Sequence, residues 1–121
     1  MTNEKDQRDS GMAQIDPEIL DKVHRIIAEL QDVNIRVEMA YLFGSIVHGT
    51  ADQWSDVDVA FISPDFSHDR FEERLRLLKI AGKIDNRIEP VPYRPDDFSD
   101  FDPLVWEIKR TGIAISLKAT T

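Results

Sequence analysis

The sequence predicts an α/β domain in which helices and strands follow each other along the chain. Between Ile19 and Leu30, apolar residues recur every three or four positions, which is the period of an amphipathic helix. Residues 35–43 begin with alternating polar and apolar side chains, and Asp56–Ile62 alternates before it becomes apolar, as half-buried strands do. Helix and strand patterns that alternate in this way are typical of α/β domains.

The first half of the chain contains one long helix and two strands. The helix begins at Asp16-Pro17, because Asp is a good N-cap and Pro suits the first helical position, and it ends within residues 32–34. We then expect a strand at 35–43, one or two helical turns at 45–50, a loop at 51–55 and a strand at 56–62.

The second half is expected to begin with a helix at 69–83. We expect its apolar side to be Phe71, Leu75, Leu78 and Ile80. The charged residues between them are expected to face solvent: Glu72, Glu73, Arg74, Arg76 and Lys79.

The segment 86–93 that follows is expected to be a strand at the edge of the sheet or a bulged strand. Pro90 and Pro92 each lack the N–H that a central strand would donate. The remaining expected elements are an acidic loop at 94–102, a short helix at 103–110 capped by Asp102, and a last strand at 113–117.

Length and composition indicate one globular domain. The chain has 121 residues, and we expect a polar, disordered tail at 1–14 followed by a single domain at 15–118. There is no cysteine, which excludes disulfides and cysteine-ligated metals. No apolar run approaches the ~18 residues of a membrane span and the N-terminus is polar, so a cytoplasmic protein is expected.

The chain is acidic, with 23 Asp and Glu against 15 Lys and Arg and a formal net charge of −8. Broad contact with nucleic-acid backbones needs basic surface, so direct binding to DNA or RNA is not expected. A bound nucleotide remains compatible with this charge, because metal ions reverse the local field. The excess of acid also favours a basic protein partner.

Two carboxylates, Asp56 and Asp58, open the second strand and are the first candidate site residues. On a strand they point to the same face, whereas Val57 and Val59 point to the other. Two carboxylates side by side repel each other unless a proton or a cation lies between them. Mg²⁺ prefers oxygen ligands and commonly bridges protein carboxylates to substrate phosphates.

A Gly44-Ser45 pair follows the first strand, and ten residues separate it from Asp56. Glycine lets the backbone approach a ligand closely, and the N–H groups at a helix start attract phosphate. Separately, a Gly-Ser pair is an ordinary turn and Asp-x-Asp is common at solvated strand ends. Their combination, with Gly49 four residues after Ser45 and Ser55 directly before Asp56, is far more specific.

This combination resembles the signature of the DNA polymerase β-like nucleotidyltransferase superfamily, and most of all its small stand-alone members, the minimal nucleotidyltransferases (MNT). The resemblance covers roughly Ile19 to Leu117. It implies a mixed sheet with helices packed on one face and the carboxylates on the other, open face. One residue departs from the pattern, since many relatives carry Arg where this chain has His48, which would weaken triphosphate binding or make it depend on pH.

The superfamily has a third acidic residue on a strand between a helix and the last helix–strand unit. Glu89 matches by its position, although relatives more often have Asp there. Asp85 is the alternative, but it lies closer to the preceding helix and its position before Asn86 suggests a turn.

The resemblance implies metal-dependent transfer of a nucleoside monophosphate from an NTP, usually ATP, to an acceptor hydroxyl. Asp56, Asp58 and Glu89 would hold two Mg²⁺ ions and carry catalysis. Gly44, Ser45 and Gly49 would bind the phosphates, with Ser55 fixing the loop before the carboxylates. Trp54 could stack on the base or simply support that loop.

The MNT resemblance also implies a partner, a HEPN-domain toxin with RNase activity, for which the MNT protein is the antitoxin and transfers AMP to a tyrosine. A homodimer is the other arrangement that would position an acceptor. Two different functions remain open: an antibiotic-modifying nucleotidyltransferase of the aminoglycoside type, which usually carries a further helical domain, and a non-catalytic module that binds a nucleotide or partner.

Overall fold

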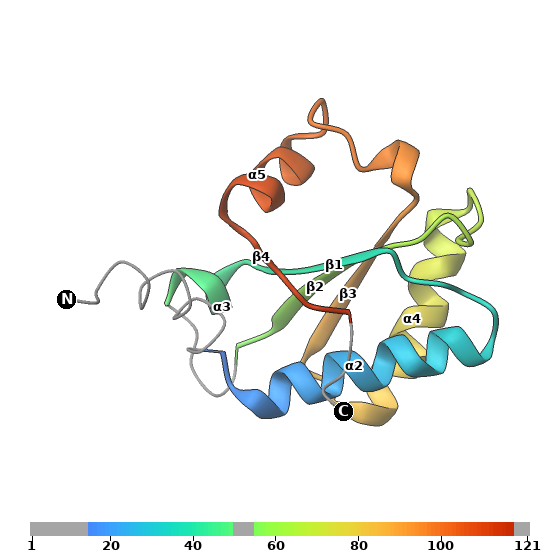
Figure 1. Cartoon of the computed structure of the whole chain (residues 1–121), viewed down its shortest axis with the longest axis horizontal. Helices are drawn as coiled ribbons and strands as arrows, with labels where there is room; N and C mark the ends of the chain where they lie inside the picture. Colours follow the sequence, from blue (N-terminus) through green and yellow to red (C-terminus); the bar gives the residue numbers. More distant parts are fainter. Residues whose placement is uncertain (1–14, 50–54, 118–121) are drawn as a thin grey trace.

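The computed structural model describes residues 15–49 and 55–117, and the expected tail at 1–14 and Trp54 lie outside these ranges. Helices and strands alternate as the sequence predicts (Figure 1). In chain order the elements are α2 (Pro17–Asp32), β1 (Met39–Phe43), α3 (Ser45–His48), β2 (Val57–Ile62), α4 (Arg70–Ile84), β3 (Ile88–Tyr93), the 3₁₀ helix η1 (Pro95–Asp97), α5 (Pro103–Thr111) and β4 (Ile113–Ala114).

The four strands form one mixed sheet in the order β3-β2-β1-β4. Strand β1 pairs antiparallel with both β2 and β4, whereas β2 and β3 are parallel. Helix α4 makes the crossover between the two parallel strands, as a βαβ unit requires. The predicted α/β class with a mixed sheet is therefore confirmed.

Two helices cover one face of the sheet and build the larger core (Figure 1). Helix α2 begins as predicted, with the Asp16 carboxylate accepting from the Glu18 N–H and Pro17 in the first turn. Its buried stripe packs with inward side chains of the strands and with α4; the members of this core include Val23, Ile26, Leu30, Leu42, Val59, Phe61 and Leu77.

Helix α5 packs on the second face of the sheet, where the resemblance implied an open surface. Val105 and Ile108 contact a smaller cluster built from Phe43, Ala60 and Tyr93. The two long helices do share one face, as expected, but α5 covers part of the other. The alternation along β2 divides the two cores, since Val57 and Val59 belong to the larger one and Ala60 to the smaller.

The prediction for the buried side of α4 is wrong for Phe71 and Leu75, although the predicted Ile80 does pack against the larger core. Glu73 is only 2% exposed and lies inward with Leu77 and Ala81, whereas Phe71 is 74% and Leu75 45% exposed. Glu73 can be buried because its carboxylate accepts from the Ser67 N–H at 2.8 Å and lies 3.4 Å from Arg76 Nε. The loop before the helix therefore decides which side faces the core.

Strand β3 lies at the edge of the sheet, as its prolines predict, and pairs with β2 without a bulge. The carbonyls of Arg87 and Tyr93 accept from Val57 and Ser63 on the β2 side. Along a strand, the backbone N–H and C=O groups of successive residues point alternately to one neighbouring strand and to the other. Since Arg87 and Tyr93 point to β2, Pro90 and Pro92 direct their backbone nitrogens to the outer edge, where no hydrogen bond of the sheet is lost.

Two strands are shorter than predicted. The first was expected at 35–43 but starts at Met39, because β2 ends at Ile62, its partner in the register, and offers no strand to pair with earlier residues. The last was expected at 113–117 but β4 covers only two residues. The chain then leaves the sheet, and the Ser116 carbonyl lies 2.7 Å from His24 Nε2 on α2.

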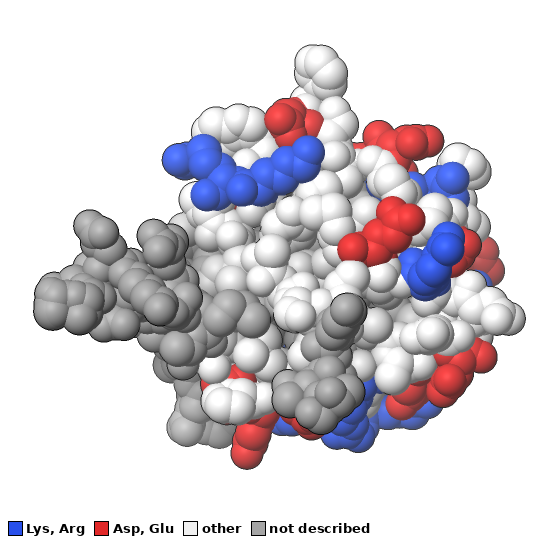
Figure 2. All heavy atoms as spheres, viewed as in Figure 1, with Lys and Arg blue, Asp and Glu red and all other residues white. Residues whose placement is uncertain are grey.

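Within the described ranges, no helix is both long enough and apolar enough to cross a membrane. On the face shown in Figure 2, the described Lys and Arg side chains form separate small groups among acidic ones.

Candidate active site

Three neighbouring strands bring the candidate residues to one end of the sheet. In the register, Phe43 at the end of β1 pairs with Asp58 on β2, and Asp58 pairs with Glu89 on β3. The Gly44-Ser45 pair follows directly after Phe43. The first two carboxylates, the third carboxylate and the Gly-Ser pair thus lie at the same end of the sheet, although Gly44 and Glu89 are 45 positions apart in the sequence.

Asp58 lies on the face of the sheet that α5 partly covers. Its neighbour Val57 is buried in the larger core on the opposite face, whereas Asp58 is itself half-buried. Asp56 lies just before β2 begins. The predicted alternation therefore holds at Asp58, while Asp56 belongs to the loop end.

Gly44 has a backbone conformation that residues with a side chain rarely adopt. Its φ of 80° and ψ of −152° fall in a region that glycine alone occupies readily. A Cβ atom at this position would also collide with Oδ2 of Asp58. The glycine of the Gly-Ser pair therefore leaves space for the carboxylate, a contact that ties the two halves of the motif together.

The short helix α3 begins at Ser45 and ends at His48, and Gly49, which caps it, is in the left-handed conformation with φ 75°. The first N–H groups of a helix have no partner inside it, and those of Ser45 and Ile46 are the first of α3. His48, the residue that departs from the superfamily pattern, is exposed in the last turn. Ser55 is half-buried directly before Asp56.

The carboxylates influence one another electrostatically. Burial raises the pKa of Asp58, and repulsion from Asp56 and then Glu89 raises it further. Negative charge is thus concentrated at this end of the sheet, and any cation placed among the three groups would relieve it.

Glu89 also has a cationic neighbour that sequence reasoning missed. Arg74 Nη2 on α4 lies 3.2 Å from Glu89 Oε1, and both side chains are partly exposed. Arg74 was expected simply to face solvent; fifteen positions separate the two residues, and only the packing of α4 beside β3 brings them together. Across residues 15–49 and 55–117, no three acidic or histidine side chains lie in a metal-binding arrangement.

Asp85, the alternative third carboxylate, lies elsewhere and has its own partners. It follows the end of α4, where Lys22 Nζ donates to its carboxylate at 2.9 Å and Arg87 lies at 3.2 Å. Burial acts to raise the pKa of Asp85, but the hydrogen bonds from Lys22 and Arg87 outweigh it and hold that pKa well below the ordinary value. Asp85 thus links α2 to the start of β3.

Comparisons with known proteins agree with this arrangement. A sequence model described as a nucleotidyltransferase domain matches residues 20–117. The fold is similar to a candidate nucleotidyltransferase from Sulfolobus solfataricus, with a TM-score of 0.55, 15% identity, and coverage of 87% of this chain and 82% of the other. It is also similar to a chain of a toxin–antitoxin structure with AMP-PNP, with a TM-score of 0.54, 21% identity, and coverage of 82% and 73% respectively. No curated protein matches.

Proposed function

The chain belongs to the nucleotidyltransferase domain family, and on that premise we propose that it transfers AMP from ATP to a tyrosine of a HEPN-type toxin. In this proposal the protein is the antitoxin of the pair. The reaction forms a bond between the acceptor oxygen and the α-phosphorus of ATP and breaks the bond to the departing pyrophosphate; the hydroxyl proton is taken up by a base.

One observation carries the catalytic part of the proposal. Asp58 lies between the Gly44-Ser45 turn on one neighbouring strand and Glu89 on the other. Phosphoryl transfer needs carboxylates for metal ions beside backbone N–H groups for the phosphates, and this end of the sheet supplies both.

Asp56, Asp58 and Glu89 offer the carboxylate oxygens that Mg²⁺ prefers, and the pKa of Asp58, raised by burial and then by repulsion from the other two carboxylates, would fall again beside a cation. When bound, two Mg²⁺ ions would neutralise the triphosphate and lower the pKa of the acceptor hydroxyl. Asp56 and Asp58 would serve both ions. Glu89 would serve the ion on the acceptor side, and it is also the candidate base for the hydroxyl proton.

The phosphate contacts are assigned to the turn after β1. The N–H groups at the start of α3, with the Ser45 hydroxyl, would hold the β- and γ-phosphates. Gly49 would close α3 beside the phosphates, and Ser55 would orient Asp56. His48 stands where relatives carry Arg, so part of the usual positive charge would depend on its protonation.

Two observations support a protein as the acceptor. A structure similar in fold is that of a toxin–antitoxin with AMP-PNP, an ATP analogue, and this chain's net charge of −8 suits a basic partner. A protein acceptor would supply its own hydroxyl and its own docking surface, which is how a small domain can gain catalysis from proximity.

The direct experiment is incubation with ATP, Mg²⁺ and a HEPN-domain protein from the same genome, followed by intact-mass measurement of that protein. We expect one or more additions of an AMP residue, with none when Asp58→Asn replaces the wild type. A partner that is inhibited without a change in mass would instead identify a non-catalytic antitoxin. AMP transfer to an aminoglycoside in a parallel reaction would identify an antibiotic-modifying enzyme.

Two observations favour the non-catalytic alternative. Arg74 neutralises Glu89 in this structure, and the described residues show no arrangement of three acidic or histidine groups around a metal position. If that ion pair persisted with nucleotide bound, the domain could bind ATP and a partner without transferring AMP. Measurements of ATP binding and of AMP transfer on the same sample separate these two outcomes.

A further inference from the structure

Helix α4 presents an apolar stripe to solvent on the side opposite its buried face. Phe71 is 74% exposed and Leu75 is 45% exposed, and Leu78, one turn further, is half-buried. Buried Glu73 and Leu77 lie on the other side of the helix. An exposed stripe of large apolar side chains with charged neighbours is a common mark of a protein interface.

The spacing of this stripe is that of a coiled-coil seam. Phe71, Leu75, Leu78 and Gly82 follow one another at intervals of four, three and four residues, which is the a/d repeat of two packed helices. Gly82 completes the series inside α4, where glycine costs about 1 kcal/mol relative to alanine. A Cβ atom there would meet nothing within 4 Å, so the backbone is open to approach by another helix.

Charged residues beside the stripe favour one orientation of a second, identical helix. Glu72 and Lys79 lie on the same flank one heptad apart, and neither has an ion pair among the described residues. If two copies of α4 pack antiparallel, the flank with Glu72 and Lys79 on one helix lies beside the same flank on the other. Glu72 would then face Lys79 of the partner subunit. A parallel arrangement would instead bring Lys79 against Arg74 of the partner subunit, which repels.

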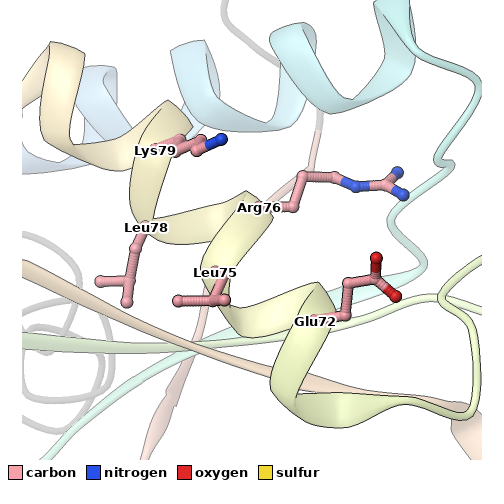
Figure 3. A pocket seen from close by; sticks show the side chains of 5 residues that line it. All are labelled: Glu72, Leu75, Arg76, Leu78 and Lys79. Atoms are coloured by element: carbon pink, nitrogen blue, oxygen red, sulfur yellow. The ribbon is translucent and has the colours of Figure 1, made fainter.

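Figure 3 shows the geometry of this surface. The Leu75 and Leu78 side chains point to one side of α4, and Glu72 and Arg76 point to the other. A hollow on the surface of α4 is lined by residues of this helix alone, namely Glu72, Leu75, Arg76, Leu78 and Lys79. A hollow with walls from a single helix is an open face that suits another helix better than it would enclose a small molecule.

We propose that a second copy of this chain covers this stripe, with α4 packed antiparallel on α4 of the partner subunit about a two-fold axis. Leu75 then lies against Leu78 of the partner subunit, and the Phe71 ring fills the space over Gly82 of the partner subunit. Every contact occurs twice, as a two-fold interface requires. Pairing through the β3 edge is disfavoured, because Pro90 and Pro92 offer no N–H on that edge. This inference does not depend on the proposed nucleotidyl transfer.

Sedimentation velocity on the full chain from about 1 µM to 1 mM tests the proposal. We expect a concentration-dependent dimer, because the seam is short. Leu75→Asp should abolish it by placing a charge in the seam. The matched control is Leu104→Asp on α5, where the leucine is 40% exposed and outside the seam, and this variant should dimerise like the wild type.

Charge exchange tests the orientation. Glu72→Lys or Lys79→Glu alone should weaken the dimer at least fivefold at low salt, and the double variant should restore it, because the pairs are then reversed but again opposite. Circular dichroism of each variant checks that α4 remains helical. A wild type that stays monomeric throughout, a dimer that survives Leu75→Asp, or a double variant without recovery would each overturn the proposal.

Discussion

The residue Asp58 keeps an unfavourable charge in the folded protein. Its pKa is raised by burial and by repulsion from Asp56 and Glu89, so the folded state binds its proton more tightly than the unfolded chain does. When folding raises the pKa of an acid, the charged form destabilises the fold. This destabilisation is complete above the pKa of the folded state and disappears as the pH falls below the pKa of the unfolded state. A site that retains such a charge is typically one that uses it.

We therefore expect Asp58→Asn to raise the free energy of unfolding at pH 7, because the substitution removes the charge and keeps a polar side chain. The gain should shrink as the pH falls and vanish below about 3.9, where the wild-type carboxyl is protonated in both states. Urea unfolding at several pH values measures this. Destabilisation by Asp58→Asn at pH 7 would contradict the electrostatic description of the site.

Asp85 should behave in the opposite way. Its pKa is lowered by Lys22 and Arg87, so it stabilises the fold above its ordinary pKa and this contribution is lost as the pH falls through the lower folded-state value. We expect Asp85→Asn to cost about 1.5–3 kcal/mol at pH 7, the range for hydrogen bonds to charged groups. The same urea series checks this, and no loss of stability would show that the Lys22 and Arg87 contacts contribute nothing.

Arg74 competes with any cation for Glu89. We expect Arg74→Ala to strengthen Mn²⁺ binding by about two- to fivefold, the equivalent of one exposed ion pair. Electron paramagnetic resonance of free Mn²⁺ gives the affinity without requiring activity. Arg76→Ala is the control, since Arg76 lies on the same helix but pairs with Glu73. Equal gains in both variants would mean a general charge effect, and an unchanged Arg74→Ala would mean that the ion pair is irrelevant to metal binding.

At the scale of the elements, local signals in the sequence were sufficient for most of the fold. The caps of α2 and α5 follow from Asp and Pro at the helix starts, and the edge position of β3 follows from its two prolines. The lengths of β1 and β4 did not follow, because a strand extends only as far as its partner, and that information lies in a different part of the chain.

The orientation of α4 could not be predicted from periodicity. Its apolar residues lie on two sides, one with Phe71 and Leu75 and the other with Leu77 and Ala81, and the charged Glu73 falls on the second side. Glu73 faces inward, where the Ser67 N–H donates to its Oε2 and Arg76 Nε lies 3.4 Å from its Oε1, although that Oε1 has no hydrogen-bond partner among the described residues. The stripe left outside is the one that we assign to a second copy of the chain.

The orientation of α4 has a direct consequence for stability. We expect Leu77→Ala to lower the free energy of unfolding by about 2–5 kcal/mol, because the side chain is fully buried and its removal leaves a cavity. Leu75→Ala should change the stability of the monomer by no more than about 0.5 kcal/mol. Both are measured by urea unfolding at about 1 µM protein, the lowest concentration of the sedimentation series, where the monomer should predominate. A larger loss for Leu75→Ala than for Leu77→Ala would mean that α4 packs the other way round.

At the scale of the whole molecule, the candidate site depends on topology. The spacing from Gly44-Ser45 to Asp56-x-Asp58 was visible in the sequence, and the family resemblance that it carries implied a common site for these residues. That Asp58 would pair in register with Glu89, or that Arg74 would reach Glu89, depends on a parallel β2–β3 pair with α4 beside it. Such contacts between distant segments have no local signature, so Glu89 rested on the family resemblance.

The central claim is that Asp56, Asp58 and Glu89, beside the Gly44-Ser45 turn, form a metal-dependent nucleotide site. Calorimetric titration with AMP-PNP, with and without Mg²⁺, tests it most directly on three proteins: the wild type, the double variant Asp56→Asn/Asp58→Asn, and Asp85→Asn. We expect Mg²⁺-dependent binding by the wild type and by Asp85→Asn, and none by the double variant, although that variant remains folded. Binding that is unchanged in the double variant, or lost in a folded Asp85→Asn, would contradict the claim.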